Sequence, residues 1–322
     1  KAISEQLMNI WLISKYACPP KYAKAPARLF ELAKEFLKLG HKTTLFTSDS
    51  NHFSDFPNTN RVYNKEIIQS IPVHWLKTYK YIKTASIKRV LSWLDFEIKL
   101  FLFPLKNFKK PDVVIISSLS IFSILFGFFL KKKYKSFLVF EIRDIWPLTL
   151  IEEGGASRYN PLVIIIGFIE KFGYKNSDLI VGTMPMLNIH VENTIGFKKP
   201  FHCSPLGFNS KKHEDSTKNE STLFMGNFPN DKTIIGYFGS LGITNALEPF
   251  IKSIEYLKGD KQIHFIIAGS GDLKKEYVDY LSECANVNFI GRVAQNKVRF
   301  YLEQCDILYL STHNSKVWSF GQ

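Results

Sequence analysis

The sequence predicts an α/β fold with two domains, each built on a parallel β-sheet. First, the chain has 322 residues, about twice the usual length of one domain. Second, short apolar strands alternate with helices in both halves, and a polar segment at residues 209–232 separates the halves. Third, 45% of the residues are hydrophobic and 22% are charged, a composition that excludes a disordered, collagen-like or coiled-coil chain.

The first half opens with a strand, a helix and a second strand. Apolar residues 9–14 form the first strand, Pro26 starts the helix, Gly40 ends it, and residues 43–47 form the second strand. A connection of this kind is right-handed and joins parallel strands. The same pattern predicts three further strands, at residues 113–116, 138–142 and 179–181.

Residues 113–130 are uncharged, and this stretch is at the lower limit of length for a membrane-spanning helix. Ser117, Ser118 and Ser120 interrupt its apolar character. We therefore expect a buried strand followed by a helix rather than a membrane span.

In the second half, the pattern predicts strands at residues 233–238, 264–268, 287–290 and 307–310. Helices are expected near residues 247–257, 273–284 and 297–304. We therefore expect an N-terminal Rossmann-like domain over residues 8–208, a linker over residues 209–232 and a C-terminal Rossmann-like domain over residues 233–322. Open parallel sheets bind ligands beyond the carboxyl ends of their strands, so the cleft between the two domains is the expected active site.

The chain carries 42 Lys and Arg against 29 Asp and Glu, a net charge of +13. Such an excess indicates a polyanionic partner: a phosphorylated substrate, an anionic lipid or a nucleic acid. No recognisable nucleic-acid-binding module is present, so nucleic acid is not expected. The four cysteines form no CxxC pair and the eight histidines have no HxxxH or HExxH spacing, so neither a metal site nor disulfides are expected. No signal-peptide pattern is present, and a reducing cytosol fits.

A basic and aromatic region covers residues 79–110. Lysines and arginines alternate there with large apolar side chains, and two acids are present. A helix of this kind suits the surface of an anionic membrane, and Lys83, Lys88, Arg89 and Trp93 are the expected contacts. The alternative is a core helix whose lysines extend to water.

Four short motifs stand at predicted strand ends or helix starts. They are residues 25–28 (APAR), 47–52 (TSDSNH), 141–147 (EIRDIWP) and 239–242 (GSLG). In this order and spacing they resemble a GT-B-fold glycosyltransferase of family 4, of the WbuB type found in bacterial surface polysaccharide assembly. The charges of the third motif have an alternative explanation, in which Arg143 and Asp144 pair to cap the sheet and Trp146 is packing.

The resemblance implies a retaining enzyme that transfers a sugar from a nucleotide sugar, usually a UDP-sugar, to an acceptor linked to a polyprenyl diphosphate. It also implies a role in O-antigen or capsule-type polysaccharide assembly, with the protein peripheral on the inner face of the cytoplasmic membrane. Neither a metal nor another cofactor is implied, because the nucleotide sugar is itself a substrate.

The donor should bind the second domain. Without a metal, N–H groups of glycine loops and helix N-termini must stabilise the leaving diphosphate. By the resemblance, the expected donor contacts are Gly239, Ser240, Leu241, Gly269, Gly271, Arg292 and Gly321. Glycine pairs at such places are also ordinary turns between a strand and a helix, and Arg292 is equally compatible with a solvated side chain.

The acceptor should bind the first domain. The expected acceptor contacts are Ser14, Lys15, Arg28, Asn51 and His52. Lys15 and Arg28 are the cations placed to meet the acceptor diphosphate. Asp144, at the end of a predicted strand, is the expected catalytic contact of the acceptor hydroxyl, and Arg143 either tunes Asp144 or binds phosphate.

The family continues beyond the position of Gln322, so the resemblance also implies that the second domain is incomplete in this sequence. Two other functions stay open: a nucleotide-sugar epimerase on the same fold, and an inactive scaffold at the membrane surface. A dinucleotide oxidoreductase is disfavoured, because no GxGxxG motif follows the first strand.

Overall fold

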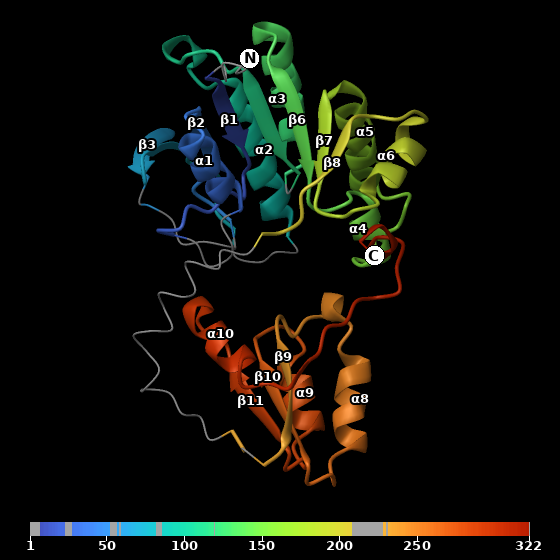
Figure 1. Cartoon of the computed structure of the whole chain (residues 1–322). Coiled ribbons are helices and arrows are strands. Elements are labelled where there is room, and N and C mark those ends of the chain that lie inside the picture. Colours follow the sequence, from blue (N-terminus) through green and yellow to red (C-terminus); the bar gives the residue numbers. More distant parts are fainter. Residues whose placement is uncertain are drawn as a thin grey trace, which may run out of the picture. The chain divides into compact units, whose positions relative to one another are not determined.

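The computed structural model of the chain is shown in Figure 1. It describes residues 7–22, 28–51, 57, 59–81, 86–118, 120–207, 228–229 and 231–321. The chain forms two compact units: unit 1 comprises Lys1–Gly207 with Ser319–Gln322, and unit 2 comprises Phe208–Trp318. Most of the predicted linker lies outside the described residues, as do Pro26, His52 and Lys83.

Unit 1 contains an eight-stranded sheet in the order β3-β4-β2-β1-β5-β6-β7-β8. Its strands are β1 (Asn9–Ile13), β2 (Lys42–Ser48), β3 (Tyr63–Ile68), β4 (Ile71–Leu76), β5 (Val113–Ser117), β6 (Phe137–Ile142), β7 (Leu179–Gly182) and β8 (Phe201–Cys203). Neighbouring strands are parallel except for β3 and β4. All five residues of β1 are buried, as expected for a parallel strand that is covered on both faces.

The antiparallel hairpin of β3 and β4 is an addition to the strands expected from the sequence. Gln69 and Ser70 make its two-residue turn, with φ angles of 48° and 67°. Turns of this length favour Asn-Gly or Asp-Gly, because positive φ is easier for those residues. The hairpin therefore lacks the sequence signal that usually reveals one.

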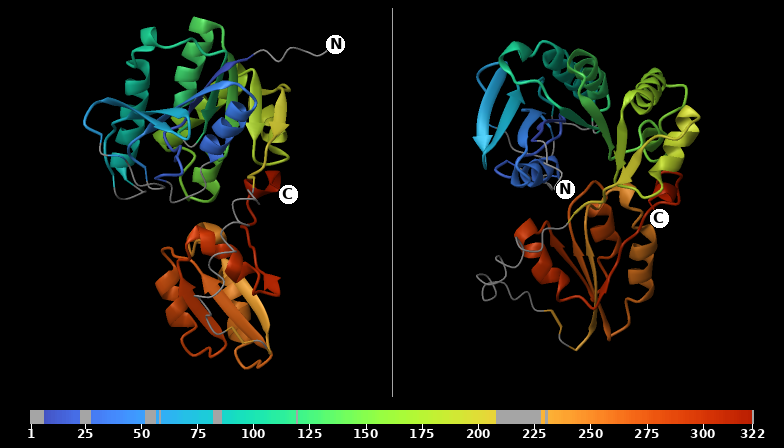
Figure 2. Two further views of the ribbon diagram at one scale, coloured as in Figure 1. Left: turned by 60° about the vertical axis from the view of Figure 1, so that its left-hand side comes forward. Right: turned by 45° about the horizontal axis from the view of Figure 1, so that its top comes forward.

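Helices cover both faces of this sheet (Figure 2). They are α1 (Arg28–Lys38), α2 (Ile87–Phe101), α3 (Ser123–Tyr134), α4 (Leu148–Glu152), α5 (Pro161–Asn176) and α6 (Leu187–Ile195). Ile10 and Leu12 of β1 belong to the core under α1. Trp11 and Ile13 belong to the core under α2, α3, α5 and α6. Successive residues of one buried strand thus supply two separate cores.

Unit 2 contains a parallel four-stranded sheet in the order β11-β10-β9-β12. Its strands are β9 (Thr233–Phe238), β10 (Ile263–Ala268), β11 (Val287–Gly291) and β12 (Ile307–Leu308), and its helices are α8 (Glu248–Tyr256), α9 (Lys274–Tyr280) and α10 (Gln295–Leu302). Phe250 of α8 packs against Phe265 of β10 and stacks on Tyr309 at 4.3 Å between ring centroids. The order of strands and helices agrees with the order expected from the sequence.

The last described residues of the chain pack on unit 1. The backbone N–H of Met186 donates to the carbonyl of Phe320 at 3.0 Å, and the Phe320 ring lies 5.4 Å from the His190 ring. The predicted second domain runs to residue 322, whereas the structure assigns Ser319–Gln322 to unit 1. The reason is that Phe320 packs against the hydrophobic core of unit 1. Gly321, an expected donor contact, is therefore part of unit 1.

The uncharged stretch at residues 113–130 forms β5 and most of α3. Among the described residues, no helix combines the length and apolar character that crossing a membrane requires. The prediction of a strand followed by a helix is confirmed.

Candidate functional site

The carboxyl ends of the parallel strands in unit 1 meet at one edge of the sheet, which we call the polar edge. Its members are buried polar residues that lie within three residues of the ends of β1, β2, β4, β5 and β6: Ser14, Lys15, Asp49, Asn51, Thr78, Ser118 and Glu141. Open parallel sheets bind their ligands at this edge. The structure thus brings three expected acceptor contacts, Ser14, Lys15 and Asn51, into one place.

Lys15 is completely buried at the polar edge. Its Nζ donates to Ser48 Oγ at 3.3 Å and to the carbonyl of Ser50, and it lies over the rings of Tyr16 and Tyr81. Burial lowers the pKa of Lys15 to about 7, and the charge of Asp49 opposes this shift. A small change in pH near neutrality therefore changes the charge of Lys15.

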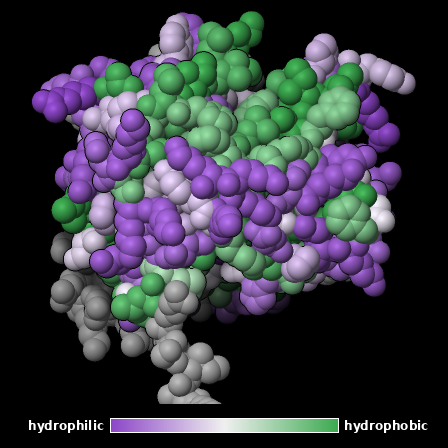
Figure 3. Space-filling model, turned by 90° about the horizontal axis from the view of Figure 1, so that it is seen from above, coloured by the Kyte–Doolittle hydropathy of each residue, from purple (hydrophilic) through white to green (hydrophobic). Residues whose placement is uncertain are grey.

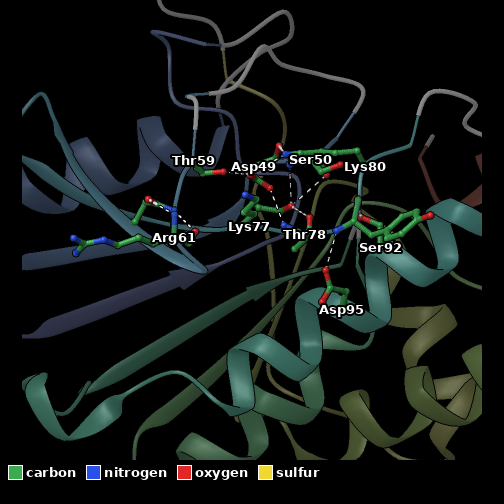
Figure 4. Close-up of polar contacts among 12 residues, drawn as sticks. Asp49, Ser50, Thr59, Arg61, Lys77, Thr78, Lys80, Ser92 and Asp95 are labelled. Carbon is green, nitrogen blue, oxygen red and sulfur yellow. Dashed lines mark hydrogen bonds and ion pairs between the residues drawn. The ribbon is translucent and has the colours of Figure 1, made fainter.

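Asp49 organises the neighbouring strand ends (Figure 4). Its carboxylate is fully buried, accepts the backbone N–H of Thr78 at 2.8 Å and pairs with Lys80 at 2.8 Å. The hydroxyl of Thr59 also donates to it. A buried carboxylate needs such partners, and these contacts fix the chain after β4, which presents Lys80 beside Lys15.

Glu97 of α2 reaches the polar edge from the helix layer and is absent from the expected site residues. Its Oε1 accepts the hydroxyls of Ser123 at 2.6 Å and Ser120 at 3.2 Å, while Oε2 has no partner among the described residues. Burial raises the pKa of Glu97 to about 8, and both serines and Lys15 oppose the shift. Its position beside Trp93, Phe96 and Leu100 on the buried face of α2 was the available sequence signal.

Arg89 and Trp93 of α2 also point into unit 1. Trp93 Nε1 donates to the Tyr16 hydroxyl at 2.6 Å and Arg89 Nε donates to it at 3.2 Å. The Arg89 guanidinium lies 5.1 Å from the centroid of the Trp93 ring. Trp93 is only 7% exposed, so its expected role as a membrane contact is wrong, and Arg89 likewise belongs to this internal cluster. Lys88 is exposed.

Asp144 and Arg143 follow β6 and are half-buried. The N–H of Arg143 donates to Ser118 Oγ at 3.0 Å, which joins the ends of β5 and β6. Burial raises the pKa of Asp144, and the charges of Arg143 and Arg89 oppose the shift. Arg89 also lowers the pKa of Lys15, so Lys15, Arg89 and Asp144 share one electrostatic neighbourhood.

Arg28 has a structural role that the sequence analysis does not anticipate. Its Nε donates to Glu141 Oε1 at 2.7 Å, and the rest of the guanidinium donates to the carbonyls of Ser204 and Pro205, both at 2.8 Å. Both charged side chains are buried. This pair ties the start of α1 to β6 and to the chain after β8, and the phosphate contact expected at Arg28 stays a prediction.

In unit 2, the two glycine loops pack against each other at the carboxyl ends of β9 and β10. A Cβ on Gly269 would lie 1.8 Å from the carbonyl oxygen of Gly239, and one on Gly271 would lie 2.3 Å from that of Leu241. The Leu241 side chain is buried in the unit 2 core. These glycines therefore allow two backbones to touch.

Several N–H groups of these loops already have partners. Gly239 donates to Ala268, Leu241 to Ser270 and Gly269 to Gly291, at 3.0, 3.1 and 2.7 Å. The expectation that these three amides face a diphosphate is corrected, because a carbonyl of the same unit accepts each of them. Ser240 and Gly271 lie in the same loops, and Arg292 is exposed directly after β11.

The described part of the chain contains no group of three or more His, Cys, Asp or Glu side chains arranged to hold a metal ion. The charged residues at the polar edge are instead a mixture of cations and carboxylates that contact one another. Such an arrangement suits an anionic ligand whose oxygens accept hydrogen bonds from lysine and arginine side chains.

The polar edge predicts an unusual dependence of stability on pH. Glu97 has a pKa of about 8 in the folded state against an ordinary value of 4.5. Folding therefore takes up protons between these values, and the free energy of unfolding should fall as pH rises from about 5 to 7. The pKa of Lys15 is about 7 against 10.5, so folding releases protons between those values and stability should rise from about pH 8 to 10.

Urea unfolding across this pH range measures both limbs. Glu97→Gln should remove the falling limb and Lys15→Met the rising limb, whereas Glu35→Gln, on the exposed face of α1, should keep both. A monotonic profile for the unchanged protein would show that these two groups do not titrate as their burial requires.

Comparison with known proteins adds to this geometry. Residues 219–320 match the model of the family described as "Glycosyl transferases group 1". The chain carries a group 1 glycosyltransferase domain. The expected enzyme class, glycosyltransferase, is confirmed at this level, and no curated protein matches the chain significantly.

Solved structures confirm the GT-B architecture of two Rossmann-like units. The sucrose-phosphate synthase of Thermosynechococcus elongatus has a TM-score of 0.64 at 14% identity, over 96% of this chain and 76% of its own. A UDP-forming α,α-trehalose-phosphate synthase from Burkholderia xenovorans has a TM-score of 0.66 at 9% identity, over 95% and 78%. HepE of Anabaena, in complex with UDP and glucose, has a TM-score of 0.57 at 14% identity, over 95% and 74%.

Proposed function

We propose that the protein is a retaining glycosyltransferase that moves a sugar from a UDP-sugar to an acceptor linked to a polyprenyl diphosphate. The observation that carries the proposal is the group 1 glycosyltransferase domain at residues 219–320, on a GT-B fold whose other unit presents buried cations and carboxylates at the polar edge. Assembly of an O-antigen or capsule-type polysaccharide at the inner face of the cytoplasmic membrane is the proposed setting.

The donor is proposed to bind unit 2. HepE and the trehalose-phosphate synthase, which share the fold, are described with UDP as ligand or product. Ser240 and Gly271 are the proposed contacts of the donor diphosphate, and exposed Arg292 is the proposed contact of the nucleobase. Donor binding at this edge agrees with the general position of ligands beyond the carboxyl ends of parallel strands.

The acceptor is proposed to bind the polar edge of unit 1. Lys15, Lys80 and Arg89 are the cations for its diphosphate, since each contacts or acts electrostatically on the same buried cluster. Asp144 is proposed to accept a hydrogen bond from the reacting hydroxyl and to orient its oxygen toward the sugar. Burial raises the pKa of Asp144, and the charges of Arg143 and Arg89 oppose that rise.

The proposal is tested by incubating the full chain with a panel of UDP-sugars and a short-chain polyprenyl diphosphate that bears one sugar. Release of UDP should depend on the acceptor, and mass spectrometry should show an acceptor longer by one sugar whose new linkage keeps the donor's anomeric configuration by NMR. Because cations of the chain are proposed to replace a metal, excess EDTA should change the rate by less than about twofold. Conversion of the donor sugar without an acceptor would point to an epimerase and contradict the proposal.

A further inference from the structure

The outer surface of the helix layer in unit 1 is apolar along α2. The residues that α2 exposes are Ile87, Lys88, Leu91, Leu94, Ile98 and Phe101, and five of these six are large hydrophobic side chains. They recur at helical spacing on one side of the helix, opposite buried Trp93, Phe96 and Leu100. One apolar side of α2 packs on the sheet, and the other apolar side is left exposed to solvent.

The same surface continues across α3 to α5. Phe101 of α2 contacts Phe129 of α3 at 5.7 Å between ring centroids, and Phe128 of α3 contacts Phe172 of α5 at 5.0 Å. On α5, Ile164, Ile165 and Phe168 are exposed, Phe168 by 69%. We call the outer surface of α2, α3 and α5 the helix-layer face. In a view from above, hydrophobic residues gather along one side of unit 1 (Figure 3).

The charges on the helix-layer face have one sign. Lys132 and Lys133 are exposed and lie over the rings of Phe128 and Phe129, and Lys171 and Lys175 are exposed on α5. The carboxylates of these three helices, all of whose residues are described, are either buried, as in Glu97 and Glu170, or paired, as in Asp95 with Lys99.

Lys132, Lys133 and Lys175 lie at one end of the face for a topological reason, whereas Lys88 lies at the start of α2. The three helices connect successive parallel strands, from β4 to β7, so they run in the same direction and end at the amino edge of the sheet. Lys131–Lys133 lie in the last turn of α3, and Lys175 lies in the last turn of α5. The result is an apolar surface with a cationic end.

We infer that the helix-layer face docks on an anionic lipid bilayer. Exposed leucine, isoleucine and phenylalanine enter the boundary between headgroups and acyl chains, and lysines at the end of the face contact lipid phosphates. The absence of exposed carboxylates on the face favours a bilayer over a second copy of this basic chain. The inference extends the proposed function, because it names the surface by which the enzyme reaches a lipid-linked acceptor.

Co-sedimentation of the full chain with vesicles tests the inference. Binding should be strong to phosphatidylcholine containing about one third phosphatidylglycerol, weak to pure phosphatidylcholine, and reduced by salt. The triple variant Leu91→Gln, Ile98→Gln, Phe168→Gln should bind at least about tenfold more weakly. Its control replaces three exposed apolar residues elsewhere and should bind as the unchanged chain does: Ile67→Gln, Tyr256→Gln, Leu310→Gln.

The charge arm uses the same design. Lys132→Gln with Lys133→Gln should weaken vesicle binding about tenfold or more, whereas Lys252→Gln with Lys258→Gln, exposed on unit 2, should not. Equal effects of face and control variants would overturn the inference. The inference would also be overturned if the unchanged chain did not bind vesicles and sedimented as a dimer, while the triple variant sedimented as a monomer.

Failure of this inference is distinguishable from failure of the proposed function. With a water-soluble acceptor that carries the same diphosphate and sugar, face variants should retain the transfer rate of the unchanged chain. Vesicle binding without transfer to any acceptor would overturn the enzymatic proposal and leave the lipid-binding face in place, and transfer without vesicle binding would do the reverse.

Discussion

Replacing Gly269 by alanine is expected to destabilise unit 2 by about 3 kcal/mol or more. The new Cβ would lie 1.8 Å from the carbonyl oxygen of Gly239, and the φ angle of Gly269 is 152°. The atom in the way belongs to the backbone of a loop that is itself fixed, because Gly239 N–H donates to Ala268 at 3.0 Å. Neither loop can move without breaking hydrogen bonds at the ends of β9 and β10.

Calorimetry of the full chain measures this effect as a lower melting temperature for the transition of unit 2. Gly259→Ala is the matched control in the same unit, since nothing lies within 4 Å of a Cβ there, and it should change stability by less than about 0.5 kcal/mol. If Gly269→Ala melted like the control, the two glycine loops would not be in backbone contact.

The alternation of strands and helices was predictable from the sequence, because the side of each element that faces the core sets the spacing of its apolar residues. β1, β5 and β6 are largely buried and each contains four successive apolar residues, which identifies parallel strands without knowledge of their partners. The β3 and β4 hairpin was not predictable in this way. Its turn residues, Gln69 and Ser70, adopt positive φ without the residue types that announce such a turn.

α2 shows a different limit of sequence analysis. Its apolar residues surround the helix, so their spacing alone does not tell which side is covered by the sheet. Trp93 was expected on the surface and is instead a hydrogen-bond donor to Tyr16, whereas Leu91 and Ile98 are exposed. The covered side is decided by partners that are distant in sequence, so composition alone does not tell which residues of α2 are exposed.

The polar edge was predicted in part, for a topological reason. Residues that directly follow parallel strands share an edge, so Lys15 and Asp144 were identifiable from strand ends. Glu97 arrives from a helix, and Arg28 finds Glu141 across 113 positions of sequence. Contacts of that range depend on packing angles that no local motif encodes.

Asp144→Asn is expected to reduce turnover at least about tenfold while the unit stays folded. Under the proposed function, the carboxylate accepts a hydrogen bond from the acceptor hydroxyl, and an amide of the same shape is a weaker acceptor. Asp95→Asn is the matched control, because Asp95 is also a half-buried aspartate of unit 1 but pairs with Lys99. The control should lose little turnover.

The pH profile of turnover separates a contact of substrate from a merely structural role for Asp144. Burial raises the pKa of Asp144 while Arg143 and Arg89 lower it, so activity should fall in acid at a pH above the ordinary range of an aspartate. Arg89→Gln removes one opposing charge and should move this acid limb to higher pH. In Asp144→Asn the limb should disappear. An acid limb that stays in place in both variants would remove Asp144 from the reaction and leave it as a cap on β6.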